Sequence, residues 1–198
     1  MTAANDRTPV TQIYLVRHAE TAWNAEARCQ GRADAPFSGL GEQQLAGLAE
    51  SLAGIEFDAA YTSPLRRAQK TAEAILAGTG LRAATVPELA ELDYGERQGT
   101  LFAEWPSELF THWRSDPWSV TFAGGESLHD VKARAVAALR RIVDAHPGET
   151  VLVSSHGHVN RVLLLELDAS PRAFWDVDQP NGSFTVLTFS GTAAWTQK

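Results

Sequence analysis

Two short apolar runs that lead directly to a histidine constrain this chain more than any other feature of its sequence. The run at 12–16 (QIYLV) is followed by Arg17 and His18, and the run at 150–154 (TVLVS) leads through one serine to His156. Short apolar runs rich in β-branched and aromatic residues predict strands. The carboxyl edge of a parallel sheet is where open α/β sheets bind ligands. We therefore expect these polar residues to meet at that edge.

Segments of strand and helix character alternate along the chain, which predicts a three-layer α/β/α sandwich around a mostly parallel sheet. No internal repeat, low-complexity tract or linker divides residues 1–198, so we expect one domain. The late strands are expected to add an antiparallel edge. Besides the two runs above, the predicted strands are 58–62, 83–86, 183–189 and 193–196, and the predicted helices begin at 38, 64, 128 and 159.

Composition excludes several classes of partner. The net charge is −7, from 17 basic and 24 acidic residues, which argues against a nucleic-acid or anionic-membrane partner because both attract a positive face. A locally positive pocket is still compatible with that charge. Cys29 is the only cysteine, so an intrachain disulfide is impossible. The polar start at 1–9 and the absence of a membrane-length apolar run lead us to expect a cytoplasmic protein.

Residues 100–125 are unusually rich in aromatic side chains. They hold Trp105, Trp113 and Trp118, half of the 6 tryptophans, together with three phenylalanines. Pro106 and Pro117 are expected to break the segment into short helical pieces. The aromatic side chains can be interpreted as a satellite core, which we favour for most of them, or as a helical and aromatic lid over the sheet edge.

Three further side chains complete a chemical set with the two histidines. Arg66 and Arg67 lie at a predicted strand-to-helix junction, and Glu91 lies in an irregular segment that also holds Asp93. A guanidinium offers a planar fork of donors that fits phosphate. A neutral imidazole is a good nucleophile near neutral pH. The residues themselves therefore point to phosphate chemistry at the sheet edge.

Five blocks in the same order resemble the histidine phosphatase superfamily, whose members have the phosphoglycerate mutase-like fold. The resemblance runs from about residue 12 to 190. In the family's second arginine block the arginine directly precedes a small residue, so the match is Arg67 and not Arg66. The blocks are LVRHAET at 15–21 with Asn24 after it, QGRADAPFS at 30–38, SPLRRA at 63–68, ELDYGE at 91–96 and SSHG at 154–157.

The resemblance implies a metal-independent mechanism through a phosphohistidine on His18, with no cofactor. Arg17, Arg67 and His156 would surround the phosphoryl oxygens, and Glu91 would protonate the leaving group. Further phosphate contacts are expected from Asn24, Gln30, Gly31 and the backbone N–H of Gly157.

Glu91 needs a raised pKa to act as an acid near neutral pH. We expect a bound phosphate dianion to raise the pKa of this carboxyl group by like-charge repulsion. Asp93 and Glu96 are weaker candidates for the same task.

Three functions are weighed. A phosphatase of small phosphate monoesters is favoured over a cofactor-dependent phosphoglycerate mutase, because residues 98–131 hold a single Lys or Arg, Arg114. A non-catalytic phosphate-binding module is the second alternative.

His156 and His158 could be read as metal ligands, but no third ligand has a suggestive spacing, so no metal is expected. The role of His158 stays open between a leaving-group contact and a solvent-facing side chain, and a homodimer is possible.

Overall fold

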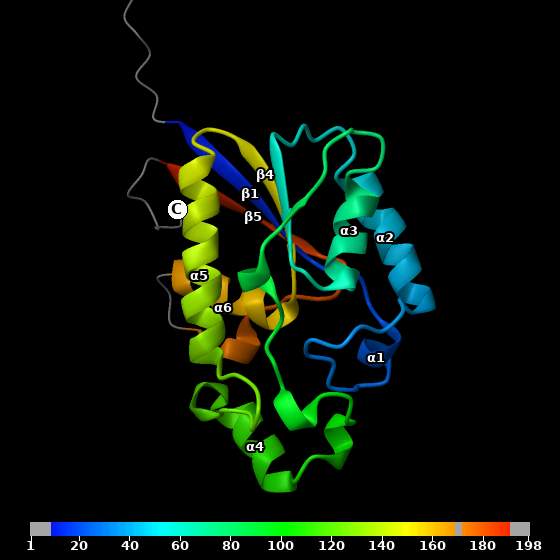
Figure 1. Ribbon diagram of the computed structural model, residues 1–198, viewed down its shortest axis with the longest axis vertical. Helices are drawn as coiled ribbons and strands as arrows, with labels where there is room; N and C mark the ends of the chain where they lie inside the picture. Colours follow the sequence, from blue (N-terminus) through cyan, green and yellow to red (C-terminus); the bar gives the residue numbers. More distant parts are fainter. Residues whose placement is uncertain (1–8, 169–171, 191–198) are drawn as a thin grey trace, which may run out of the picture.

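A five-stranded sheet in the order β3-β2-β4-β1-β5 forms the centre of the computed structural model, which describes residues 9–168 and 172–190 (Figure 1). Four strands are parallel, and β5 runs antiparallel to β1. This confirms the mostly parallel sheet with an antiparallel edge, while the predicted strand at 193–196 lies outside the described residues. The strands are β1 (Val10–Arg17), β2 (Ala59–Thr62), β3 (Ala84–Thr85), β4 (Thr150–Ser155) and β5 (Phe184–Ser190).

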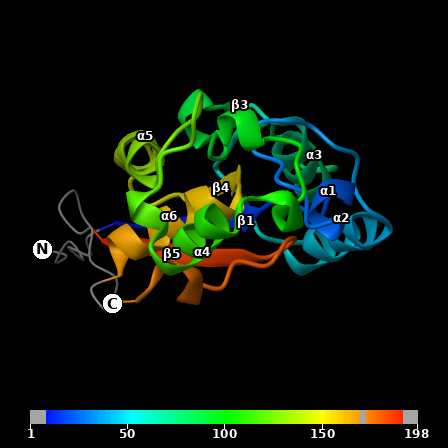
Figure 2. The same ribbon diagram turned by 90° about the horizontal axis from the view of Figure 1, so that it is seen from below.

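Helices cover both faces of the sheet, as the three-layer prediction requires (Figures 1 and 2). Along β1, Ile13 and Leu15 belong to the core beneath α5 and α6, whereas Val16 belongs to the core beneath α2 and α3. This alternation is the period of a strand that is buried on both faces. None of the helices in the described ranges has the length and apolar character that a membrane span needs. The covering helices are α2 (Gly39–Ser51), α3 (Arg66–Ile75), α5 (Leu128–Ala145) and α6 (Gly157–Leu167).

Two helix starts differ from the sequence expectation. The segment after His18 was expected to be a loop, but it contains a single helical turn, α1 (Ala22–Ala25). Thr21 and Asn24 form a capping box there, which satisfies backbone donors that would otherwise lack partners. The helix expected to begin at Pro64 begins two residues later, at Arg66. Ser63 therefore follows β2 directly, and Pro64 and Leu65 separate it from the helix.

The segment at 100–125 lies beyond the carboxyl ends of the parallel strands (Figure 1). Its helix α4 (Ser107–Ser115) follows Pro106 directly, and Pro117 opens a short 3₁₀ helix, so the prolines do divide the segment. Trp105, Trp113 and Phe122 are buried and continuous with the main core, which favours the satellite core for these side chains. Tyr94 contacts the rings of all three.

Gly41 fixes the approach of α2 to the loop after His18. A Cβ built on Gly41 would lie 1.9 Å from the carbonyl oxygen of Glu20, whereas nothing lies within 4 Å of a Cβ on Gly47 in the same helix. We expect Gly41→Ala to lower the free energy of unfolding by about 2 kcal/mol or more, because backbone must shift. Gly47→Ala is expected to raise it by roughly 0.5–1 kcal/mol through helix propensity. Urea unfolding of both variants checks this, and equal effects would contradict it.

Candidate active site

The residues that directly follow three neighbouring strands lie close together. His18 follows β1, Ser63 follows β2 and His156 follows β4, which lies between those two strands. The ring centroids of His18 and His156 are 5.2 Å apart. Parallel strands end at one edge, so sheet order alone explains why residues 18, 63 and 156 meet.

His18 presents one ring nitrogen, Nε2, that carries no proton. Its Nδ1 lies 2.8 Å from the carbonyl oxygen of Ala19, and its Nε2 accepts a hydrogen bond from Nε of Arg67 at 3.2 Å. A carbonyl can only accept and a guanidinium can only donate, so both contacts assign the proton to Nδ1. Burial, and then the charges of Arg67 and Arg17, lower the pKa of His18 well below its usual value. The imidazole is therefore neutral, with Nε2 as the nucleophilic atom.

Arg67 and Arg17 place two buried positive charges beside His18. Arg67 is 3% exposed, and its two terminal nitrogens donate to the carbonyl oxygens of Ala33 (2.7 Å) and Gly31 (2.6 Å). Arg17 donates to the carbonyl oxygen of Gln179, while its buried Nε has no partner within the described part of the chain. Burial lowers the pKa of each guanidinium to about 10, which leaves both charged at neutral pH. Carbonyls hold both side chains in place, and the ion pair that Arg67 makes with the exposed Asp34 is long, at 3.9 Å.

His156 also has an unused donor. Its Nε2 lies 2.6 Å from the hydroxyl of Ser63, and that hydroxyl already accepts the backbone N–H of Leu65. A serine hydroxyl can donate one hydrogen and accept two, so we assign its hydrogen to Nε2, and with this assignment the ring proton lies on Nδ1. This buried Nδ1 has no partner among the described residues. An unsatisfied buried donor costs about 1–3 kcal/mol, so Nδ1 of His156 and Nε of Arg17 both indicate a site built for an anion.

Glu91 is the buried carboxylate of this site. Its Oε1 accepts the backbone N–H of Leu92 at 2.9 Å, and its Oε2 lies 3.3 Å from the backbone N and 3.2 Å from Nδ1 of His158. Burial by itself raises the pKa of Glu91, but His158 and the N–H of Leu92 outweigh burial and hold it well below its usual value. The free site thus keeps Glu91 ionised. Any rise of this pKa must come from the substrate.

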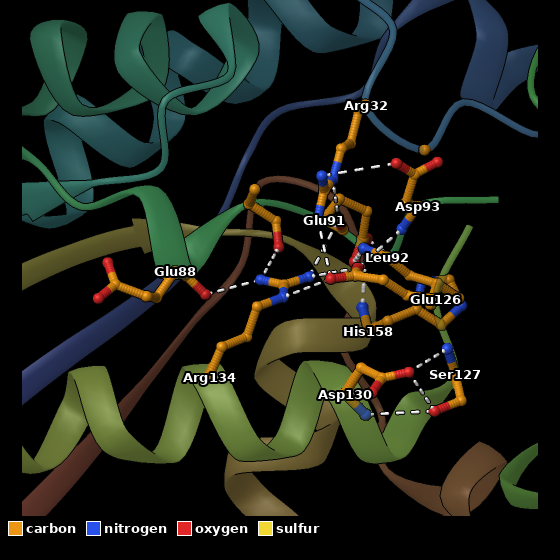
Figure 3. Close-up of polar contacts among 12 residues, drawn as sticks. Arg32, Glu88, Glu91, Leu92, Asp93, Glu126, Ser127, Asp130, Arg134 and His158 are labelled. Atoms are coloured by element: carbon orange, nitrogen blue, oxygen red, sulfur yellow. Dashed lines mark hydrogen bonds and ion pairs between the residues drawn. The ribbon is translucent and has the colours of Figure 1, made fainter. Parts of the chain in front are cut away.

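A partly buried ion pair fixes the segment that carries Glu91 (Figure 3). Arg134 of α5 pairs with Glu126 at 2.9 Å and donates to the carbonyl oxygens of Glu88, Ala90 and Glu91. Glu126 also pairs with Arg32 at 2.9 Å. The backbone around Glu91 is therefore tied to α5 and to the loop that holds Arg67, so these parts of the site support one another.

The predicted phosphate contacts have different surroundings. The amide of Gln30 is occupied at both ends, by the Thr21 hydroxyl and the Ala33 carbonyl, and Gly31 offers its carbonyl to Arg67. Asn24 accepts from Thr21 through Oδ1. Gly157 begins α6 next to His156, and a Cβ there would lie 3.1 Å from Cζ of Arg17. In this structure residues 30 and 31 contribute by shaping the loop around Arg67, and their contact with phosphate stays a prediction.

The competing candidates lie elsewhere. Asp93 accepts the N–H of Gly95 and pairs with Arg32, while Glu96 and Arg66 are exposed. Within 9–168 and 172–190, no group of three or more His, Cys, Asp and Glu side chains is arranged to hold a metal ion.

Sequence reasoning missed three residues that complete the site. Ser63 was treated as part of a helix start, although it ends a strand just as His18 does. Gln179 accepts from Arg17, and Asn181 donates to the backbone oxygen of His18 at 3.2 Å. Because β5 runs antiparallel, the turn before it returns to the edge where β1 ends. The polar Gln-Pro-Asn-Gly turn before an expected antiparallel strand was the available signal.

Comparison with known proteins agrees with this geometry. A family model described as the histidine phosphatase superfamily (branch 1) matches residues 13–198. Phosphoserine phosphatase 1 of Hydrogenobacter thermophilus is 35% identical over 90% of this chain and 86% of its own. A 2,3-bisphosphoglycerate-dependent phosphoglycerate mutase of Brucella anthropi is 38% identical over 79% and 81%. The solved structure of YhfR from Bacillus stearothermophilus superposes with a TM-score of 0.84 at 34% identity, covering 89% and 90%.

The two neutral buried histidines make stability depend on pH. Burial lowers the pKa of His156 as it does that of His18, so below about pH 6.5 the unfolded chain binds protons that the folded chain does not. We expect the free energy of unfolding to fall by roughly 2 kcal/mol between pH 7 and 5.5, from up to about 1.4 kcal/mol per pH unit per histidine.

Urea unfolding across this pH range measures that loss. His18→Gln is expected to remove about half of the slope, while His129→Gln, at an exposed position, is the matched control. A slope unchanged in His18→Gln would contradict a neutral His18.

Proposed function

The chain belongs to the histidine phosphatase superfamily, and from this premise we propose that it hydrolyses small phosphate monoesters through a phosphohistidine on His18. The observation that carries the proposal is the neutral His18, whose unprotonated Nε2 lies against the guanidinium of Arg67. The guanidinium groups of Arg17 and Arg67 supply fixed positive donors that attract a phosphate dianion.

In the first step, Nε2 of His18 attacks phosphorus and the bond to the leaving oxygen breaks. Arg17, Arg67 and Nδ1 of His156 donate to the phosphoryl oxygens, where charge is stabilised in the transition state. The unpartnered donors on Arg17 and His156 support this assignment, because an arriving anion would satisfy both. We place the N–H of Gly157 and the amide of Asn24 among the further contacts.

Glu91 is proposed as the general acid and base. Its carboxyl group gives a proton to the leaving alkoxide and then takes one from the water that attacks the phosphohistidine. Glu91 is ionised in the free site, so its first proton comes either from a substrate that binds as its monoanion or from solvent, once a bound phosphate dianion raises the pKa of Glu91 through like-charge repulsion.

The mutase alternative is disfavoured by the charge of the segment next to the site. A mutase must hold the carboxylate of a phosphoglycerate and therefore needs basic groups there. Arg114 is the only Lys or Arg within 98–131, and its guanidinium lies 4.6 Å from the ring centroid of Trp175. Several relatives nevertheless carry a phosphoglycerate mutase name, so the assay below includes that reaction.

Three further expectations belong to this proposal. We propose that the chain acts as one domain, that it works in the cytoplasm, and that a homodimer is compatible with the site. The satellite core of 100–125 is proposed to form one wall of the substrate cleft. Size-exclusion chromatography with light scattering decides the oligomeric state.

Phosphate release in excess EDTA tests the function. The substrate panel is p-nitrophenyl phosphate, phosphoserine, phosphoglycerates, sugar phosphates and α-ribazole phosphate. We expect metal-independent release by the wild type and a loss on the order of 10³-fold or more in His18→Ala, because the nucleophile is gone. His129→Ala, which changes an exposed histidine, is the matched control.

Two other results would contradict the proposal. Conversion of 3-phosphoglycerate to its isomer on addition of bisphosphoglycerate, without phosphate release, identifies a mutase. Tight binding of phosphorylated ligands without turnover of any monoester identifies a binding module.

A further inference from the structure

His158 contacts Glu91 through both its backbone and its side chain. It lies in the first turn of α6, two residues after His156, and its side chain is 15% exposed. Its backbone N and its Nδ1 both lie within 3.3 Å of Oε2 of Glu91. A carboxylate can only accept, so Nδ1 carries a proton that it donates to Glu91.

The other nitrogen of His158 is held as well. Nε2 lies 3.1 Å from the hydroxyl of Tyr94, which is 3% exposed. Tyr94 is three residues from Glu91, so the same short segment contacts the imidazole at both nitrogens. A phenol can donate to a neutral imidazole or accept from a charged one. The donation from Nδ1 to Glu91 is therefore kept in either charge state of His158.

Aromatic rings fix the plane of the imidazole. Phe174 stacks on it at 5.8 Å with an interplanar angle of 15°, and Trp113, Trp175 and Tyr94 lie within 5.9 Å by ring centroids. A ring enclosed in this way cannot turn without moving the satellite core. The aromatic segment therefore also holds in place the His158 imidazole that donates to Glu91.

The charges around His158 come from four elements. Glu91 and Tyr94 face it from the 91–94 segment, and Arg161 packs from its own helix over the rings of Phe174 and Trp175. Arg114 of α4 covers the ring of Trp175, and Arg17 at the end of β1 lies against Gly157. Glu91 is the only carboxylate in direct contact with the imidazole among the described residues.

We propose that His158 is a positioning residue for the general acid, which holds the Glu91 carboxyl group toward the leaving-group oxygen while Tyr94 fixes the imidazole. The inference rests on the proposed function, because it concerns the step in which the leaving alkoxide is protonated. It predicts that His158 matters for poor leaving groups and matters little for leaving groups that need no proton.

Leaving-group dependence is the experiment. The value of kcat/KM is measured for p-nitrophenyl phosphate, whose phenolate leaves without protonation, and for β-glycerophosphate, whose alkoxide needs a proton. We expect His158→Leu to lower kcat/KM for the alkyl ester by on the order of 10²-fold, with a change below about 3-fold for the aryl ester. His158→Asn, which keeps a neutral N–H donor near Nδ1, is expected to recover most of the loss.

Two controls separate positioning from structure. In a Glu91→Gln background, His158→Leu should have no further effect on the alkyl ester, because the group it positions is gone. Tyr94→Phe should give a smaller loss with the same leaving-group dependence, and it keeps the proposal testable if His158→Leu does not fold. Equal losses on both esters, or no loss on either, would overturn the proposal.

A spectroscopic readout is independent of turnover. Removing the donor of His158 leaves the burial of Glu91, so its pKa should rise in His158→Leu; difference infrared titration measures it, with Glu91→Gln as the blank. An unchanged pKa of Glu91 would contradict the contact.

The failure of the proposed function and the failure of the positioning role can be told apart. If the wild type hydrolyses no monoester, the proposed function fails. If it hydrolyses both esters but His158→Leu shows no leaving-group dependence, only the positioning role fails.

Discussion

The contact between Arg67 and His18 is the interaction on which the rest of the site depends. A buried cation beside a buried imidazole is unfavourable if the imidazole is charged, so the contact enforces a neutral His18. The same guanidinium is held by two loop carbonyls and not by a buried carboxylate. Desolvating a charge costs several kcal/mol, and here much of its charge remains available to a ligand. An arriving phosphate group therefore meets donors that need no rearrangement.

Glu91 receives its supports from two directions. Arg134 and Glu126 fix its backbone from α5, while His158 and Leu92 fix its carboxyl group from α6 and from its own segment. The aromatic residues of 100–125 do not need to move in order to serve this arrangement. They pack around Tyr94 and His158, so a segment that looks peripheral in the ribbon becomes part of the support of a reacting group (Figure 1).

Much of this arrangement could be predicted from sequence, because the ends of the buried strands can be located from the hydrophobic pattern. Apolar runs that end in Arg17, His18 and His156 predict side chains at one edge of a parallel sheet, and sheet order then brings them together. The start of α3 was placed two residues early, because Pro64 suits a first helical turn but lies before it here. The contact of His158 with Glu91 joins residues 67 positions apart. It depends on a rotamer fixed by aromatic packing, which a linear pattern does not encode.

The covalent intermediate is the most direct test of the account. Wild-type protein is mixed with a ³²P-labelled monoester, quenched on the millisecond scale under alkaline conditions and mapped by peptide analysis. The account predicts an early burst of acid-labile label on His18 that disappears as substrate is consumed. Label on any other residue, or steady turnover with no labelled protein at any time, would contradict a mechanism built on the unprotonated Nε2 of His18.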